Sequence, residues 1–425
     1  MKVLMFGWEF PPHIAGGLGT ACHGIAKGLT LNGADVIFVM PRAFGDEDTS
    51  VARVINASEV AIDPRHATFY NQASHISFIE VNSKFIPYVG LDDYYNLVNQ
   101  TRSTTWAERE PHKRVYRFAG GYTANLMQEI EHYAVVAEEL ARTETFDIIH
   151  AHDWHTYKAG IAAREVSGKP LVVHVHATEF DRSDEKHRNT LVADIEREGM
   201  MAADAVLAVS DFTRQRIIEG YHIPENKVFT IHNAVEPGQK EITRYKTVNE
   251  KIVTFLGRIT FQKGPDYFVE TARLLLQKDR NLRFVLAGDG DMMEQIIERV
   301  AELEISDRFH FTGFLRGGEI NLLFGMSDVY VMPSVSEPFG ISPLEAMEAG
   351  VPVVISKQSG VAEVLDYAIK VDFWDIEAMA DAIHGILHYS ALANFFAQNG
   401  TKNVQQLTWE KVGQKILRCY EFLTK

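Results

Sequence analysis

Short runs rich in valine and isoleucine alternate with helical patterns along the chain, and this alternation limits the fold more than any other feature. In the first half the runs lie at residues 2–6, 36–40, 148–152, 171–176, 205–209 and 228–232. A second series lies at residues 252–256, 283–287, 310–312, 328–332, 353–355 and 369–371. Strands that alternate with helices form parallel sheets with helices packed on their faces. The sequence therefore predicts an α/β fold with two successive units.

Two irregular regions and one helix complete this outline. The helix is expected directly after the first strand. Residues about 43–120 break the alternation with mixed aromatic and charged residues, and we interpret them as an inserted set of hairpins or lid loops. The polar stretch at 236–251 begins with Glu-Pro-Gly and is typical of a linker. The first helix would end at Asn32-Gly33. Its apolar stripe consists of Leu18, Cys22, Ile25 and Leu29.

Length, charge and cysteine content narrow the class of protein. The 425 residues are 46% hydrophobic and 23% charged, which fits a globular protein of two or three domains. A formal net charge of -15 argues against a nucleic-acid partner and against binding to anionic membranes. No apolar run reaches the length of a transmembrane segment, and the first residues lack the features of a signal peptide, so we expect a cytoplasmic protein. Cys22 and Cys419 are the two cysteines, which predicts neither a disulfide framework nor a thiolate zinc site.

Two glutamates eight positions apart, Glu337 and Glu345, flank the start of a helix expected from about Pro343. The backbone N–H groups before this helix would form an anion site. A carboxylate beside such a site suits sugar hydroxyls next to a phosphate, so the pair fits a sugar joined to a nucleotide. The alternative is that Glu337 caps the helix and Glu345 is solvated. The residues that offer the N–H groups are Phe339, Gly340, Ile341 and Ser342.

Gly16 and Gly17 lie between the first strand and its helix, where backbone without side chains can approach a phosphate or a sugar. The G-x-G-x-x-G spacing of a dinucleotide site is absent, and no acidic residue follows the second strand to hold a ribose. A nicotinamide oxidoreductase is therefore not favoured. The alternative is that these glycines only permit tight helix packing.

Arg258 and Lys263 place two permanent cations on the loop after the first strand of the second half. Arginine can fork onto phosphate oxygens and lysine supplies a point charge, so together they can stabilise a departing diphosphate without a metal ion. The alternative is a solvated loop whose cations pair with nearby acids.

Two histidine pairs, residues 150 and 152 and residues 174 and 176, close neighbouring strands, with Asp153 beside them. These side chains could bind a metal ion, form hydrogen bonds in the core or contact a substrate, and we expect no metal site. The segment Asp289-Gly290-Asp291 also resembles a metal motif. We interpret it as a strand-to-helix turn with a helix N-cap.

These segments together resemble retaining glycosyltransferases of the GT-B type, in the group that includes glycogen and starch synthases. The resemblance extends over essentially the whole chain. It implies two Rossmann-like domains that face a central cleft: residues 1–236 together with a final helix at 409–425 that crosses back, and residues 251–408 for the nucleotide-sugar donor. The segments that carry it are residues 16–19, 150–154, 176, 204–210, 258–263, 337–340 and 345.

The resemblance also implies roles for the candidate residues. Arg258 and Lys263 would hold the donor diphosphate, and Glu337 would contact the transferred sugar. His176 would line the sugar site. The catalytic residues would then be His176, Arg258, Lys263 and Glu337. Asp153 would lie on the acceptor side. The donor-binding set would be Gly16, Gly17, Phe339, Gly340, Ile341, Ser342 and Glu345, with Glu345 on the ribose. No cofactor and no metal ion is implied.

Residues 8–12 and the His-Asp-Trp segment are similar to glycogen synthases, which implies transfer of glucose from ADP-glucose or UDP-glucose to an α-1,4-glucan such as glycogen or a maltooligosaccharide. Two positions depart from that group: Ile14 stands where a lysine is usual, and Ala234 follows His232-Asn233 in place of glycine. The alternatives are a transferase for another lipid, polysaccharide or small acceptor, a UDP-sugar 2-epimerase, and a noncatalytic binding protein.

Overall fold

The structure is a computed structural model that describes residues 1–13, 16–63, 107–110, 113–122, 125–183, 186–236 and 249–425. Most of the linker predicted at 236–251 and most of the insertion predicted at 43–120 lie outside these ranges. Within them, no helix combines the length and the apolar character needed to cross a bilayer.

The first sheet has seven parallel strands in the order β3-β2-β1-β6-β7-β8-β9. Valine- and isoleucine-rich segments form these strands, as is expected where a parallel sheet is buried on both faces. The strand bounds are β1 Lys2–Phe6, β2 Asp35–Met40, β3 Arg53–Asn56, β6 Ile148–His152, β7 Leu171–Val175, β8 Ala205–Ala208 and β9 Val228–Thr230. The helices between them are α1 Gly17–Leu31, α4 Leu126–Thr143, α5 Trp154–Ser167, α6 Glu179–Arg182, α7 Thr190–Ala202 and α8 Asp211–Tyr221.

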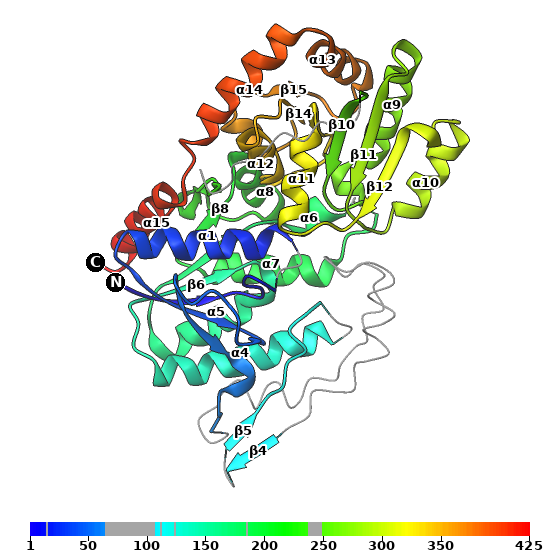
Figure 1. The fold of residues 1–425 in the computed structure, drawn as a ribbon. Helices are drawn as coiled ribbons and strands as arrows, with labels where there is room; N and C mark the ends of the chain where they lie inside the picture. Colours follow the sequence, from blue (N-terminus) through cyan, green and yellow to red (C-terminus); the bar gives the residue numbers. More distant parts are fainter. Residues whose placement is uncertain (14–15, 64–106, 111–112, 123–124, 184–185, 237–248) are drawn as a thin grey trace.

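Alternate residues of β1 point into two separate cores. Leu4 and Phe6 pack with α4, α5 and α7, whereas Val3 and Met5 pack with α1 and with the last helix of the chain. The helices α1 and α4 accordingly lie on opposite sides of the sheet (Figure 1). The predicted stripe on α1 is buried, and Gly33, with a φ of 82°, follows the end of the helix as expected.

The second sheet has six parallel strands in the order β12-β11-β10-β13-β14-β15. Helices α9, α10 and α13 cover one face, and α11, α12 and α14 pack on the other. The two predicted α/β units with parallel sheets are therefore confirmed. The strands are β10 Lys251–Leu256, β11 Leu282–Ala287, β12 Phe309–Gly313, β13 Val329–Met332, β14 Val353–Ser356 and β15 Ile369–Val371. The helices are α9 Pro265–Lys278, α10 Met293–Glu302, α11 Gly318–Met326, α12 Ser342–Glu348, α13 Ile376–His388 and α14 Ser390–Val404, with short 3₁₀ turns η3 Phe261–Lys263 and η5 Gly360–Glu363.

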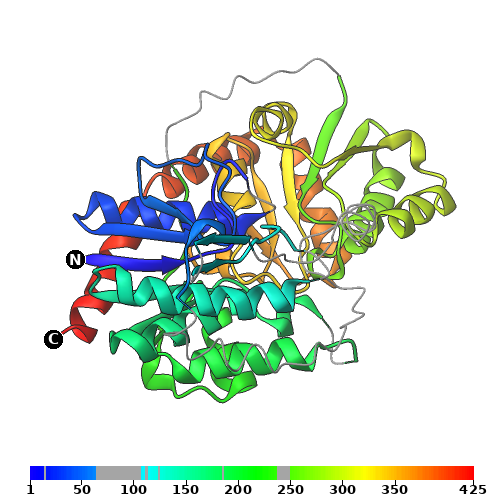
Figure 2. The ribbon, with the colours of Figure 1, turned by 90° about the horizontal axis from the view of Figure 1, so that it is seen from below.

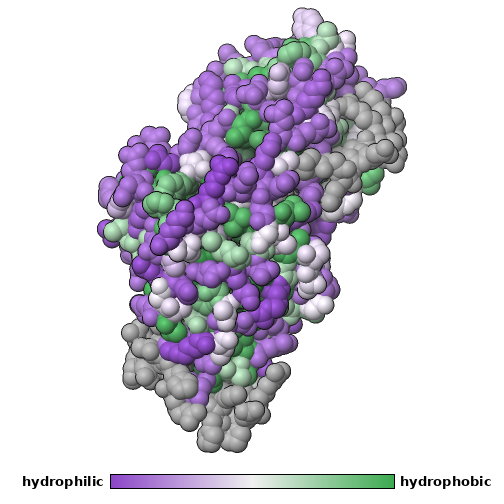
Figure 3. Space-filling view, turned by 90° about the vertical axis from the view of Figure 1, so that its left-hand side faces the viewer, coloured by the Kyte–Doolittle hydropathy of each residue, from purple (hydrophilic) through white to green (hydrophobic). Residues whose placement is uncertain are grey.

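The last helix, α15 (Trp409–Leu423), follows the second unit in sequence but packs on α1 of the first. Glycines let the two backbones approach: a Cβ at Gly28 would lie 2.0 Å from the carbonyl oxygen of Trp409, and one at Gly413 would lie 2.1 Å from Gly28. The two chain termini consequently lie at the same edge of the molecule (Figure 2). The face that includes this edge is mainly hydrophilic, with apolar groups in small, separate areas (Figure 3).

Two details differ from the sequence-based expectations. Residues 53–56, within the segment predicted as an insertion, form β3 and pair in parallel with β2, and the other described strands of that segment, β4 (Ala107–Glu110) and β5 (Lys113–Val115), pair with each other. The N-cap predicted at Asp289-Gly290-Asp291 is wrong, because the N-cap of α10 is Met292. The segment forms the turn before that helix, where Asp289 accepts a hydrogen bond from the backbone N–H of Gly290 (2.8 Å).

Candidate active site

The loops at the carboxyl ends of the two sheets meet. The Ser210 hydroxyl, at the start of α8 in the first half, donates a hydrogen bond of 2.5 Å to the carbonyl of Pro338 in the second. The helix α6, after β7, contacts η3, after β10. In open parallel sheets ligands bind outside these strand ends, and the predicted site residues lie on the loops that follow them.

Lys263 and Glu337 form an ion pair between two loops of the second half. Glu337 is 5% exposed, and its carboxylate also accepts a hydrogen bond from the Ser334 hydroxyl (3.3 Å). Its backbone is fixed on both sides, since its N–H donates to the carbonyl of Gln358 (3.0 Å) and its carbonyl accepts from Gly360 (2.9 Å). The pair is therefore a charged, partly buried centre with little freedom to move.

Two glycines with positive φ bring these loops together. Gly264, with a φ of 63°, lies where a Cβ would be 2.3 Å from the carbonyl oxygen of Pro333. Gly340 has a φ of 97°, and a Cβ there would be 3.1 Å from Cγ of Glu337. Residues with side chains rarely adopt these φ values. Glycine at both positions thus permits the close approach of the lysine loop to the glutamate loop.

Arg258 lies on the same loop as Lys263 but contacts a different residue. Its guanidinium donates a hydrogen bond of 3.0 Å to the side chain of Gln262. The carbonyl of Gln262 in turn accepts the backbone N–H of Val335 (2.9 Å), two residues before Glu337. The two cations predicted to act on one diphosphate therefore come from one loop. Lys263 contacts Glu337 itself, and Arg258 contacts Gln262, whose backbone carbonyl binds the segment before Glu337.

The segment from Phe339 to Glu345 divides into buried and available groups. Phe339 is 3% exposed and packs in the apolar core, so its side chain serves the fold. The helix α12 begins at Ser342, and Ile341 is the N-cap without a side-chain hydrogen bond. The first N–H groups of a helix lack intrahelical partners, which leaves the predicted anion site without a capping side chain. Glu345 lies in the first turn and is half-buried, and the alternative in which Glu337 caps the helix does not hold.

Gly16 and Gly17 begin α1 in the first half. Gly16 is the N-cap, no side chain caps this end, and the first turn has no acidic residue. No described protein atom lies within 4 Å of where a Cβ of Gly17 would be. Among the described residues a Cβ at Gly17 would therefore meet open space, so the tight packing that was the alternative for these glycines does not hold at Gly17.

Asp153 follows β6 in a backbone conformation that is unusual for a residue with a side chain, with φ 59° and ψ 169°. Its carboxylate is buried and accepts the backbone N–H groups of His176 (2.6 Å) and Ala177 (3.4 Å). Burial raises the pKa of Asp153 to about 7 despite these hydrogen bonds. Strained, buried carboxyl groups of this kind concentrate at functional sites.

His176 lies on the turn that Asp153 holds. One ring nitrogen is 2.9 Å from a ring nitrogen of His152. Burial lowers the pKa of His176 to about 3, so the ring is neutral at pH 7. The structure thus brings Asp153 and His176 into one group on the first half, and Arg258, Lys263 and Glu337 into another on the second.

Comparison with known proteins bears on the family and the fold of the chain. The model of the family Glycosyltransferase Family 4 matches residues 101–239, and the model of Glycosyl transferases group 1 matches residues 239–403. An uncharacterised glycosyltransferase of Methanocaldococcus jannaschii is 26% identical over 99% of this chain and 98% of its own length. The glycogen synthase of Mycobacterium tuberculosis is 23% identical over 99% of this chain and 94% of its own. The structure of the Anabaena protein HepE in complex with UDP-glucose is similar with a TM-score of 0.65 at 18% identity, and the match covers 100% of both chains.

The chain is a glycosyltransferase of the GT-B type. The family resemblance inferred from the motifs is confirmed.

The glycosyltransferase also contains a buried histidine cluster beneath the site. Nitrogen atoms of His150, His152 and His174 lie within 4.8 Å of one another, and a second such group joins Cys22 to His152 and His176. These residue types can bind a transition metal. The three rings of the first group lie at interplanar angles of 12° to 33° to one another, and burial lowers the pKa of each well below its usual value. As arranged, the cluster is a stack of neutral rings.

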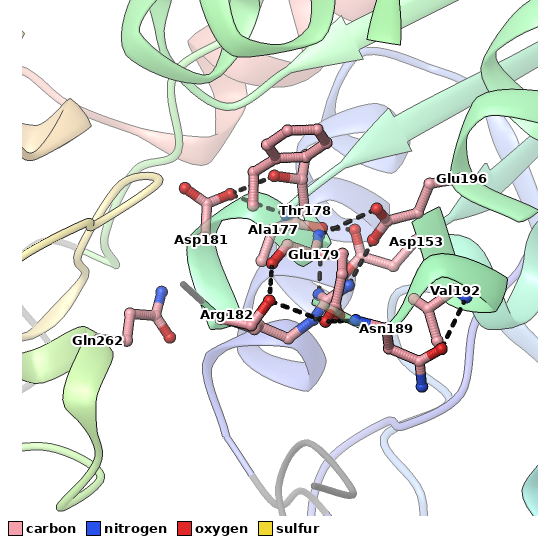
Figure 4. Close-up of polar contacts among 12 residues, drawn as sticks. Asp153, Ala177, Thr178, Glu179, Asp181, Arg182, Asn189, Val192, Glu196 and Gln262 are labelled. Carbon is pink, nitrogen blue, oxygen red and sulfur yellow. Dashed lines mark hydrogen bonds and ion pairs between the residues drawn. The ribbon is translucent and has the colours of Figure 1, made fainter. Parts of the chain in front are cut away.

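The motif analysis missed an ion network in the glycosyltransferase just after His176. Arg182 contacts the carboxylates of Glu179 (3.3 Å) and Glu196 and donates to the carbonyl of Ala177 (3.3 Å), and Figure 4 shows these groups beside Asp153. All three charged side chains are at most 8% exposed. The sequence signal was present, because three charged residues, at 179, 181 and 182, follow a buried strand almost at once.

Proposed function

We propose that this glycosyltransferase transfers a hexose from a nucleotide-sugar to a glycan hydroxyl with retention of configuration and without a metal ion. The observation that carries the proposal is the contact of Lys263 with Glu337. Lys263 would be the cation for a leaving diphosphate, and Glu337 beside it would be the carboxylate for sugar hydroxyls.

The demanding step is the loss of the nucleotide diphosphate, because negative charge grows on the leaving group. Lys263 and Arg258 would stabilise that charge from the second half, and the open helix end at Gly17 would do so from the first. Placed before the reaction, these groups need no rearrangement in the transition state. Their charges would replace the role that a bound metal ion has in other transferases.

Retention would come from attack on the face of the sugar that the phosphate leaves. The Glu337 carboxylate is held by Lys263, and one oxygen of Asp153 accepts two backbone N–H groups. Because the carboxylate nearest the proposed diphosphate site is held in this way, we propose no covalent sugar intermediate. The departing phosphate would instead receive the proton of the acceptor hydroxyl.

For the substrates we propose glucose from ADP-glucose or UDP-glucose and an α-1,4-glucan acceptor. Support comes from the similarity to a glycogen synthase and from a structural neighbour described in complex with UDP-glucose. We place the reaction in the cytoplasm, since both cysteines are free thiols, as is usual in reducing compartments.

A nucleotide-release assay tests the proposal. The purified protein is given UDP-, ADP- and GDP-sugars, each with and without glycogen or maltooligosaccharide, in EDTA. We expect acceptor-dependent release from one glucose donor, with loss in Lys263→Ala and Glu337→Ala. Lys278→Ala is the matched control, because Lys278 also pairs with a carboxylate of the second half but at an exposed surface (2.8 Å to Asp381).

The other outcomes separate the alternatives. Release from a different donor or with a different acceptor would keep the transferase and replace its substrates. Conversion of the donor to an epimer without acceptor would indicate a 2-epimerase. Binding of donor without turnover would indicate a noncatalytic protein.

A further inference from the structure

The two groups of the site are joined by a short hydrogen-bonded path. The helix α6 begins three residues after His176 and contacts η3, the turn that carries Lys263. Figure 4 shows Gln262 of that turn facing Asp181 and Arg182 of α6. The acceptor-side loop and the donor-side loops are therefore in direct contact.

Three side chains form the centre of this contact. The Arg216 guanidinium on α8 donates to the Asp181 carboxylate (2.6 Å) and to the Ser336 hydroxyl (2.8 Å). The Ser336 hydroxyl donates to the same Asp181 oxygen (2.7 Å). Asp181 and Arg216 belong to the first half and Ser336 to the second, and we name this triangle the cross-domain clasp.

Each end of the clasp is tied to a candidate site residue. The other oxygen of Asp181 accepts the backbone N–H (2.8 Å) and the hydroxyl (2.7 Å) of Thr178, two residues after His176. Ser336 immediately precedes Glu337, and its N–H lies 3.4 Å from the carbonyl of Gln262. A shift of the clasp would thus move the turn of His176 relative to the Glu337–Lys263 pair.

Water molecules cannot easily take over the hydrogen bonds of the clasp, because its side chains are buried or partly buried. The Asp181 side chain is 0% exposed, Arg216 is 25% exposed, and Ser336 is buried. A buried carboxylate that loses a charged partner keeps its desolvation cost, so the triangle holds one geometry firmly. Such geometry is needed where reacting groups come from two separate units.

We propose that Asp181, Arg216 and Ser336 are positioning residues that set the His176 turn against the Glu337–Lys263 pair. The proposal rests on the proposed transferase function. None of the three needs to touch the substrate, because each acts through the backbone of a neighbouring site residue.

The test compares Ser336→Ala, Arg216→Ala and Arg216→Lys with Arg214→Ala. Arg214 is the matched control, because it lies on the same helix and also binds a carboxylate (Glu225, 2.8 Å) and a carbonyl (Val228, 3.1 Å), but only within the first half. Ser336→Ala and Arg216→Ala should lower kcat roughly tenfold to a hundredfold, the scale of an ångström-size misplacement, with the donor KM within about threefold. Arg216→Lys should recover part of the loss, and Arg214→Ala should match the wild type. Equal kcat values in Arg216→Ala and Arg214→Ala would overturn the clasp.

Amide hydrogen exchange gives a readout that does not need turnover. Peptides over residues 176–183 and 334–342 should exchange faster in Ser336→Ala than in Arg214→Ala, at unchanged melting temperature, whereas equal exchange would overturn the proposal. If the wild type turns over no donor while these peptides respond, the proposed function fails and the clasp stands as a contact between the two units. Ser336→Ala is the mild variant, since it leaves the Asp181–Arg216 pair and the start of α6 intact.

Discussion

The two sides of the site use opposite electrostatics. On the second half, Lys263 and Glu337 are both charged and in direct contact. On the first half, the Asp153 carboxyl accepts two backbone N–H groups, and the neighbouring His176 is neutral because burial lowers its pKa. We propose from this difference that Lys263 meets the charge of a diphosphate, whereas Asp153 and His176 meet neutral hydroxyl groups.

Removal of the Lys263 charge should have the largest effect. Lys263→Ala removes a cation from the leaving group and also leaves the Glu337 carboxylate buried without its ion-pair partner. We expect turnover to fall on the order of a hundredfold to a thousandfold, as when other preorganised electrostatic groups are removed. Steady-state nucleotide release measures it. A loss of under threefold would place the diphosphate elsewhere.

Arg258→Lys should cost less, roughly tenfold in kcat/KM. The substitution keeps the charge but loses the planar fork that holds Gln262 and could grip two phosphate oxygens. Melting temperature serves as the control, because Arg258 is half-buried and its loss should leave the fold intact. Wild-type kinetics in this variant would show that Arg258 acts only as a positive charge.

How far the sequence predicted this site depends on the kind of interaction. The positions of the strand ends followed from the alternation of elements, and the apolar stripe on α1 fixed its buried face, so the candidate residues were found at the loops that meet. The contact of Lys263 with Glu337 joins residues 74 positions apart, and that of Ser336 with Asp181 joins residues 155 apart. Such pairs depend on how two sheets are placed against each other, which local patterns do not encode. The positive φ of Asp153 could not be predicted either, because the position holds aspartate and not the glycine that usually indicates such a conformation.

On the neutral side of the site, Asp153→Asn should reduce turnover by roughly tenfold. The amide oxygen can still accept the N–H groups of His176 and Ala177, so the turn is kept while the titrating group is lost.

The raised pKa of Asp153, about 7 against an ordinary 3.8, also makes the stability of the protein depend on pH. Its contribution is fully present below pH 3.8 and is lost as the pH rises through 7.

The measurement is the free energy of unfolding by urea for both proteins between pH 4 and pH 8. Groups that do not interact with Asp153 cancel in the difference, whereas Glu196, whose charge raises the pKa of Asp153, contributes together with it. The stability of the wild type relative to Asp153→Asn should therefore decline across this range. A difference that is constant with pH would show that Asp153 is ionised throughout, and the contrast between the two sides of the site would be lost.

The smallest expected effect is at the helix end that faces the diphosphate from the first half. Gly17→Ala should raise the donor KM about threefold to tenfold, because a methyl group would occupy the open space where the backbone meets a phosphate. Stability should not fall, since that methyl group meets no described protein atom within 4 Å and alanine favours a helix.

Gly28→Ala, on the same helix, is the opposite control, because its methyl group would lie 2.0 Å from the Trp409 carbonyl. It should destabilise the packing of α15 by about 2 kcal/mol or more with little direct effect on KM. Thermal unfolding and donor titration on the two variants separate the roles. If Gly17→Ala left KM unchanged, the diphosphate would be held by the second half alone.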